Sequence, residues 1–254
     1  MIEAPQSFVT RQECDKVAFQ HGFRRPHGET DGWRRYSSTT AQGSIWLASG
    51  DAGWMLAIDH AGVVAEIGIE PAEVNGPGLS RFRFGPLGTL YASMPRVYEL
   101  AISLPDAPLR EFLQRTRDLP KETEAERLLV QRVGQSVFRE RLMKYWQGRC
   151  PLTGIDHPAL LRASHIQPWR DCETDEARLD VHNGLLLSAL WDAAFDGGLV
   201  TFDDNGHPQF SAELGERAVL ALAYERPLRL TDQHRAFLEW HRTRVFQTSE
   251  QHLC

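Results

Sequence analysis

The sequence lacks the features of a membrane, secreted or disulfide-rich protein. The cysteines are few and stand far apart: Cys14, Cys150, Cys172 and Cys254. No Cys-x-x-Cys pair occurs, so neither a zinc ribbon nor a disulfide framework is expected, and a reducing cytoplasm is the natural setting. The longest nearly apolar stretch, residues 184–195, is interrupted by Ser188 and Asp192 and is shorter than the ~20 residues that span a bilayer. The N-terminal segment has no apolar core of a signal peptide, so we expect neither export nor membrane contact.

Several common catalytic signatures are also missing. The chain has no G-x-S-x-G, P-loop or G-x-G-x-x-G motif, which argues against a hydrolase with a nucleophile elbow, an NTPase and a dinucleotide-binding enzyme. Its 254 residues are 42% hydrophobic and 24% charged, close to the composition of globular proteins, and they suffice for one large domain or two modest ones.

The net charge of −6 argues at first against a nucleic-acid partner, but the charge is unevenly distributed. Residues 127–149 contain six basic residues and one acid (6 − 1 = +5), whereas residues 171–204 contain one basic residue and nine acids (1 − 9 = −8). A basic segment followed by an acidic one suits a phosphate-binding surface beside a metal-binding pocket. Two solvated faces of opposite sign are the alternative.

Residues 1–105 indicate a small mixed domain of unknown role, in specificity or in assembly. Thr10 and Glu13 form a capping box that predicts a short helix up to about His21. Short β-rich runs separated by turn residues predict an antiparallel meander, with strands at 33–36, 44–48, 54–58, 63–67 and 81–84. A helix is expected over residues 87–102, with a kink or a break at Pro95.

Aromatic residues gather on these predicted strands: Trp33, Trp46, Trp54, Phe82 and Phe84. Such side chains form the core of a small sheet more often than not. A surface or pocket that reads a modified base is the alternative.

Residues 106–122 are expected to be a linker with a short helix over 108–117. The surrounding stretch 104–123 contains three prolines. Thr123 and Glu126 form a second capping box. It opens a long helical segment toward Trp146. Gly134 weakens this segment in the middle, so one helix and two helices are both left open.

The pattern after residue 149 is of short elements. We expect strands at 149–153, 160–166 and 185–188, a polar loop at 168–182 and a helix at 189–196. A hairpin over 199–202 and 209–210, built around Asn205-Gly206, and helices at 212–224 and 231–246 complete the chain.

Four polar residues in this segment stand where chemistry can occur. His165 ends an apolar strand, and Asn183 begins a turn before Gly184. Asp192 and Asp196 are one helical turn apart, so both carboxylates lie on one helix face. This order of a strand histidine, a loop asparagine and a helix carboxylate describes two strands and a helix that can hold one metal ion.

The motifs ASHIQPW (163–169) and RLDVHNGLLLSALWDAAFDGGLVTFDDNG (178–206) occur in this order, after the lead-in GQSVFRERLMKYWQGRCPLTG (134–154). Together they resemble the HNH endonucleases of the ββα-metal superfamily over about residues 123–246. The resemblance implies an α+β protein, with the small antiparallel sheet and helices followed by a ββα-metal nuclease domain at 123–254 that helices flank.

The same resemblance implies a role for each polar residue. His165 would be the general base that takes a proton from the attacking water. Asn183 would orient the loop that holds His165. Asp192 stands where typical members have the last histidine of the triad and would bind the metal, with Asp196 as a second ligand or a hydrogen-bonding partner. Without these motifs, a lone histidine on an apolar strand is more often a satisfied core residue.

Two departures from the family pattern affect the metal. Many relatives have Asp or His before the general base, where this chain has Ser164, and the triad ends in Asp. Oxygen ligands favour a hard ion, so we expect Mg²⁺ or Mn²⁺ before Zn²⁺. Phosphate contacts are expected from residues on the preceding helix or beside the site: Arg132, Gln135, Arg139, Arg162, Arg170 and Arg178. A solvated helix face with ion pairs is the alternative for the helical residues.

The sequence thus predicts a cytoplasmic, metal-dependent endonuclease that hydrolyses DNA, with RNA left open as a substrate and a role in restriction or phage defence implied by resemblance. A homodimer is expected, because one such site cuts one strand. Two alternatives stay open. One is an inactive nucleic-acid-binding or scaffold protein that kept the fold, which Ser164 favours, and the other is a nuclease toxin.

Overall fold

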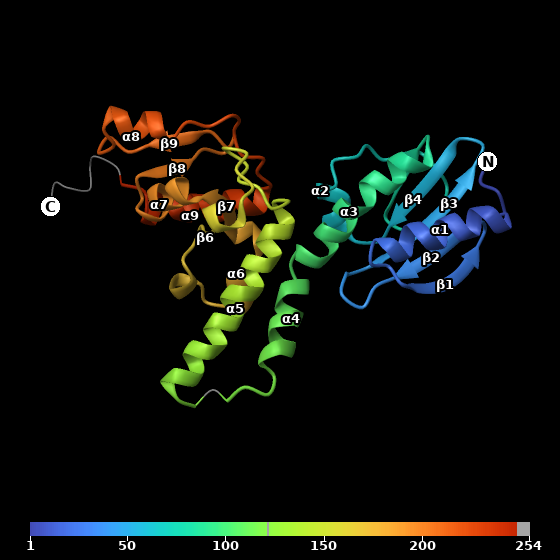
Figure 1. Cartoon of the computed structure of the whole chain (residues 1–254), viewed down its shortest axis with the longest axis horizontal. Helices are drawn as coiled ribbons and strands as arrows, with labels where there is room; N and C mark the ends of the chain where they lie inside the picture. Colours follow the sequence, from blue (N-terminus) through green and yellow to red (C-terminus); the bar gives the residue numbers. More distant parts are fainter. Residues whose placement is uncertain (121, 248–254) are drawn as a thin grey trace. The chain divides into compact units, whose positions relative to one another are not determined.

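The computed structural model describes residues 1–120 and 122–247 and divides the chain into two compact units, Met1–Ala107 and Pro108–Cys254 (Figure 1). Each unit has its own core, and each is described by itself. Within the described residues, no helix combines the length and the apolar character that crossing a bilayer requires.

The N-terminal unit is a five-stranded antiparallel sheet with the strands in sequence order (Figure 1). The strands are β1 (Arg25–Thr30), β2 (Trp33–Ser37), β3 (Ser44–Gly50), β4 (Gly53–Ile58) and β5 (Ser80–Phe84). The helices are α1 (Phe8–Gln20), α2 (Ala61–Glu66) and α3 (Leu87–Ser103). The predicted antiparallel sheet with helices is therefore present, with one more strand at its start than the meander we expected.

The core lies between the sheet and the two longer helices. Tyr36, Leu47, Leu56 and Phe82 are buried on one face of the strands, and α1 and α3 pack there. Because side chains of a strand alternate between faces, the intervening residues lie on the other face. The helix-covered face thus supplies the apolar burial that holds this unit together.

Three details of this unit differ from the prediction. Helix α1 begins before Thr10, because the Ser7 side chain accepts a hydrogen bond from the Thr10 N–H and caps the helix there. The expected strand at 63–67 is instead helix α2. The His60 ring caps its first turn by accepting a hydrogen bond from the Val63 N–H. Pro95 lies inside a continuous α3.

The second unit contains two small hairpins surrounded by helices. The strands are β6 (Leu161–His165) paired with β7 (Gly184–Ser188), and β8 (Val200–Phe202) paired with β9 (Pro208–Phe210). The α-helices are α4 (Ala107–Thr116), α5 (Glu124–Tyr145), α6 (Asp175–Leu179), α7 (Ala189–Asp196), α8 (Glu216–Ala221) and α9 (Asp232–Arg244). Single 3-10 turns occur at Pro158–Leu160, Trp169–Asp171 and Val181–Asn183.

Two predicted elements of this unit are wrong. Residues 149–153 are not a strand, because their backbone closes a turn in which the Gly154 N–H donates to the Cys150 carbonyl. The expected helix at 212–224 is reduced to α8, which begins after Gly215. The expected polar loop at 168–182 also contains the short helix α6, which Thr174 caps.

Helix α5 is one continuous helix that begins at the predicted capping box of Thr123 and Glu126. Gly134 does not divide it. A Cβ atom at Gly134 would lie 2.4 Å from Cη2 of Trp169, so the glycine lets the loop after β6 pack directly on the helix. The low helix propensity of glycine is offset here by close packing.

Two histidines of α9 are buried in the second unit. His234 is fully buried and its Nδ1 contacts the Thr231 hydroxyl at 2.8 Å. His241 contacts Thr201 Oγ1 and the Phe195 carbonyl, which ties α9 to β8 and α7. Burial lowers the pKa of His234 to about 3 and that of His241 to about 4, so both rings are neutral in the folded protein.

We predict that Gly134→Ala lowers the melting temperature, although alanine is the better helix former. The added methyl overlaps the Trp169 ring, and overpacking of this kind costs about 1–3 kcal/mol. Gly88 in α3 is the matched control, because a Cβ atom there would have no other atom within 4 Å. Gly88→Ala should therefore be neutral or stabilising. Equal melting shifts in the two variants would contradict the packing role of Gly134.

Acid is expected to destabilise the second unit through its buried histidines. Their pKa values are lower in the folded state than in the unfolded chain, so below about pH 6.5 the unfolded chain binds more protons. The free energy of unfolding should therefore fall as the pH drops from about 6.5 toward 4 and stay level above that window. Urea unfolding of the second unit at a series of pH values measures this slope.

The variant His241→Gln removes one of the two rings and should flatten the slope. His207 is exposed, so His207→Gln is the control that should leave the slope unchanged. A slope of unaltered steepness in His241→Gln would show that its burial in the folded state does not govern acid stability.

Candidate functional site

Strand β6 lies between α5 and α7, and its side chains alternate between the two helices. Both helices pack against it, and β6 pairs antiparallel with β7, which places Ser164 opposite Leu185 and His165 opposite Gly184. Ser164 contacts α7, whereas His165 contacts α5. The two adjacent side chains thus lie in different surroundings, Ser164 beside α7 and His165 beside α5.

The His165 ring is held from three sides. It stacks on Phe138 of α5 with the ring centroids 3.7 Å apart, and the edge-on ring of Trp169 has its centroid 5.8 Å away. Nε2 of His165 lies 2.9 Å from the carbonyl oxygen of Arg178. Because a carbonyl can only accept, Nε2 carries the proton and Nδ1 carries the lone pair.

The electrostatic environment keeps this ring neutral. Burial lowers the pKa of His165, against a smaller opposing effect from the hydrogen bond to the Arg178 carbonyl. The side chain is half-buried, and Nδ1 has no hydrogen bond to any residue that the structure describes. The ring therefore presents an unprotonated nitrogen in a fixed orientation.

Asn183 is fully buried and its side chain holds the chain after β6. Its Oδ1 accepts from the Gln167 N–H at 2.7 Å. Its Nδ2 donates to the carbonyls of Gln167 at 3.1 Å and Ala177 at 3.0 Å. A buried amide is costly unless it is hydrogen-bonded, so this set of bonds fixes the backbone two residues after His165.

Arg178 also stabilises this loop. Its guanidinium donates to the carbonyls of Trp169 and Cys172 and to the carboxylate of Asp175. These internal acceptors take up the donors that we expected to contact phosphate. Arg178 thus positions the Trp169 segment and, through its own carbonyl, the His165 ring.

The two predicted carboxylates lie beside Ser164. Helix α7 has the predicted bounds and carries Asp192 and Asp196 one turn apart. The Ser164 hydroxyl donates to Oδ1 of Asp196 at 3.0 Å. Arg162, two residues before Ser164 on the same face of β6, is close enough to lower the pKa of Asp192.

The surroundings of both carboxyl groups disfavour their charged form and raise their pKa values. Desolvation raises the pKa of Asp192, and the charge of Asp196 raises it further, while Ser164 and Arg162 oppose the shift. Desolvation also raises the pKa of Asp196, against the Ser164 hydrogen bond. A cation near the pair would relieve both effects.

The donor atoms of this cluster limit the choice of metal. Across residues 1–120 and 122–247, no group of three or more His, Cys, Asp or Glu side chains could hold a metal ion. Two carboxylates and a hydroxyl suit an ion such as Mg²⁺, which keeps several waters and takes one or two carboxylates plus phosphate oxygens.

The other predicted contact residues fall into two groups. Arg132, Gln135 and Arg170 are exposed, and Arg170 makes only a 3.5 Å ion pair with Asp171. Arg139 instead donates to the carbonyls of Leu161 at 3.1 Å and Pro158 at 3.0 Å. Arg162 is exposed and donates to the carbonyls of Ala159 and Leu161.

The structure therefore gathers the predicted residues into two clusters at one end of β6. One contains Ser164, Asp192, Asp196 and Arg162, and the other contains His165, Asn183 and Arg178. Within the described part of the chain, no hydrogen bond joins the two clusters. The expectation that His165 and Asp192 act around one pocket stays a prediction.

Sequence reasoning missed the residues that position His165. Phe138, which stacks on the imidazole, and Gln167, which binds Asn183, were not singled out. A signal existed in α5, because Gly134 and Phe138 are four residues apart and lie on one helix face. A glycine and an aromatic residue at this spacing favour a helix face on which another segment packs closely.

Residues 150–203 match the family model described as HNH endonuclease. The matched segment contains β6, β7, α7 and both clusters. No curated protein matches the chain. His165, Asn183, Asp192 and Asp196 all lie in the segment that is similar to HNH endonucleases, and this similarity supports nuclease chemistry in general.

Proposed function

We propose that the protein is a metal-dependent endonuclease that hydrolyses DNA phosphodiester bonds, with β6, β7 and α7 as its ββα-metal unit. The observation that carries this proposal is the oriented imidazole of His165 beside a strand neighbour that contacts a carboxylate pair. The family match supports nuclease chemistry, and the geometry supports the roles of the individual residues.

His165 is the proposed general base. The Arg178 carbonyl holds Nε2–H, so the Nδ1 lone pair is the atom that takes a proton from an attacking water. As the water oxygen bonds to phosphorus and the P–O3′ bond breaks, that proton moves to Nδ1. A lowered pKa keeps the base unprotonated at neutral pH.

Asp192 and Asp196 are the proposed metal ligands, with the Ser164 hydroxyl beside them. Their raised pKa values mark two carboxylates whose negative charge is poorly compensated. A bound Mg²⁺ or Mn²⁺ would polarise the scissile phosphate and stabilise the leaving 3′ oxygen. Zn²⁺ is less suited to this set of oxygen donors.

Contacts to the phosphate backbone are proposed for the predicted residues whose side chains stay accessible. Arg162 lies beside the carboxylate pair, where its charge can hold a phosphate next to the ion. Arg132, Gln135 and Arg170 are exposed and available for neighbouring phosphates. Arg139 and Arg178 are proposed to hold the site together through the backbone carbonyls that they bind.

The biological setting proposed for this activity is restriction or phage defence in the cytoplasm, with a homodimer cutting both strands. An inactive DNA-binding protein with the same fold is the second candidate. Its specific support is Ser164, a hydroxyl where relatives have a metal-binding side chain, which leaves the ion fewer strong ligands.

Replacing the proposed base should abolish cleavage. We expect His165→Ala to nick supercoiled plasmid at least ~10²-fold more slowly than the wild type in Mg²⁺ or Mn²⁺, the usual contribution of a general base. Gel electrophoresis of the plasmid measures the rate. His207→Ala removes an exposed histidine and should cleave normally, whereas equal cleavage by His165→Ala would end the assignment.

Metal binding distinguishes the active nuclease from the inactive alternative. In calorimetric titrations with Mn²⁺ alone, Asp192→Asn should weaken binding by more than the roughly ten-fold that loss of an outer partner of a metal site causes. Asp232 is 96% exposed, and Asp232→Asn is the matched control. A wild type that binds no Mn²⁺, or an Asp192→Asn variant with unchanged affinity, would favour the inactive protein.

A further inference from the structure

One face of the N-terminal sheet is not covered by the helices that bury the other. The β-ladder registers place Trp33, Trp46, Met55 and Ala57 on this second face, while α1 and α3 pack against the side chains between them. We call it the open face. Its apolar centre is a small buried cluster of Trp33, Ala48, Met55 and Ala57, against which Ile2, Trp46 and Val74 pack.

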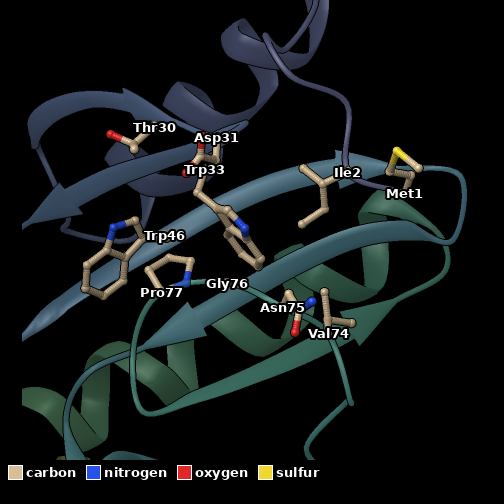
Figure 2. Close-up of a pocket in the computed structure, with 10 residues that line it drawn as sticks. All are labelled: Met1, Ile2, Thr30, Asp31, Trp33, Trp46, Val74, Asn75, Gly76 and Pro77. Carbon is tan, nitrogen blue, oxygen red and sulfur yellow. The ribbon is translucent and has the colours of Figure 1, made fainter.

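A pocket of about 580 Å³ lies on the open face (Figure 2). Trp33 and Trp46 supply aromatic walls, and Ile2 and Val74 add apolar surface. Polar groups come from Thr30, Asp31 and Asn75 at its margin, which Figure 2 shows around the two indoles. A volume of this size and an apolar lining with a few polar groups are typical of sites for small molecules.

The wall opposite the sheet is held in place by one arginine. Nε of Arg81 donates to the Val74 carbonyl at 3.0 Å, and Nη1 donates to the Gly78 carbonyl at 3.3 Å. These two bonds fix the segment that runs through Asn75 and Gly76. A Cβ atom at Gly76 would lie 2.6 Å from Cζ2 of Trp33, so the glycine lets the backbone follow the indole closely.

The charged side chains that strands β2 to β5 place on the open face are arginines. The guanidinium of Arg35 lies 5.4 Å from the centroid of the Trp46 ring, across the β2–β3 pair. Arg83 lies opposite Met55 and is exposed. Together with Arg81 they make three arginines on this face, and strands β2 to β5 contribute no carboxylate to it. Arginines beside accessible aromatic surface are typical of sites that bind a single nucleic-acid strand, and the half-buried Trp46 supplies that surface here.

We propose that the open face binds a DNA strand and that the pocket takes one of its unpaired bases. The half-buried Trp46 indole stacks on the planar ring, while the Asp31 carboxylate accepts from the amino group of a base and Asn75 can both donate and accept. Arg35 and Arg83 contact the phosphates on either side. A base inside a duplex cannot enter, so the occupied base is single-stranded or extruded. The proposal rests on the proposed nuclease function for the identity of the polymer.

Binding of a labelled single strand tests this directly. The probes are a fluorescein-labelled DNA strand and the same strand with its central bases replaced by abasic sites, followed by anisotropy in EDTA. The full-length His165→Ala protein is used, so that neither metal nor cleavage enters the measurement. We expect the strand with bases to bind about ten-fold more tightly, as stacking of one base on an aromatic ring allows.

Two substitutions in the pocket should remove this preference. Trp46→Ala deletes a half-buried stacking ring, and Asn75→Phe, at an exposed loop position, fills the pocket instead. Phe8→Ala, which removes an exposed aromatic side chain on α1, is the matched control and should keep the preference.

A second pair of variants tests the charge. Arg83→Ala should weaken binding of both strands equally and should reduce the slope of log affinity against log salt concentration by about one. Lys16→Ala on α1 should leave both quantities unchanged.

Three results would overturn the proposal: no binding of the single strand, equal binding of the two strands by the starting protein, or an undiminished preference in both pocket variants. Its failure is distinguishable from failure of the nuclease assignment. Plasmid cleavage by the wild type without a base preference refutes the pocket alone. A base preference without cleavage refutes the nuclease alone.

Discussion

The buried amide of Asn183 is the interaction on which the geometry of the site depends. It supplies one acceptor and two donors to a backbone that would otherwise leave polar groups unpaired, at Gln167 and Ala177. Losing a partner in such a buried set costs about 1–3 kcal/mol for each unsatisfied group. The chain that returns from β6 to β7 is therefore held at both ends by one side chain.

The orientation of His165 follows from that fixed segment. Arg178 lies in it, binds its carbonyls, and offers its own carbonyl to the imidazole. Helix α5 completes the arrangement from the other side, because Gly134 admits Trp169 and Phe138 stacks on the ring. A rigid support of this kind restricts the ring to one tautomer and one direction, which proton transfer requires.

Much of the second unit could be predicted because local chemistry decides it. The capping box at Thr123 and the bounds of α7 are local signals, and the structure has both.

Other elements could not be predicted from local patterns. In the first unit, the strand predicted at 63–67 is wrong because the side chain of His60 caps a helix there, an effect that β-propensity does not include. The short helix α6 was missed inside what the composition indicated was a polar loop.

For the site, sequence patterns indicated which residue types matter but not which atoms they meet. Arg178 lies in the predicted polar loop at 168–182, and only the folded loop shows that its donors are directed to carbonyls. Arg139 is similar, since Pro158 and Leu161 come close to it only after folding. Long flexible side chains next to a motif are the least predictable part of a site, because their partners are distant in sequence.

The alternation of Ser164 and His165 along β6 has a consequence for how such a site can change. In the proposed scheme, Ser164 faces the acidic helix α7 and His165 faces the aromatic side chain of α5, so the two chemical tasks fall to adjacent residues that contact different helices. A substitution at position 164 can then alter the preferred ion while the proton acceptor at position 165 keeps its surroundings. Separate tuning of this kind would let one scaffold diversify by single amino-acid steps.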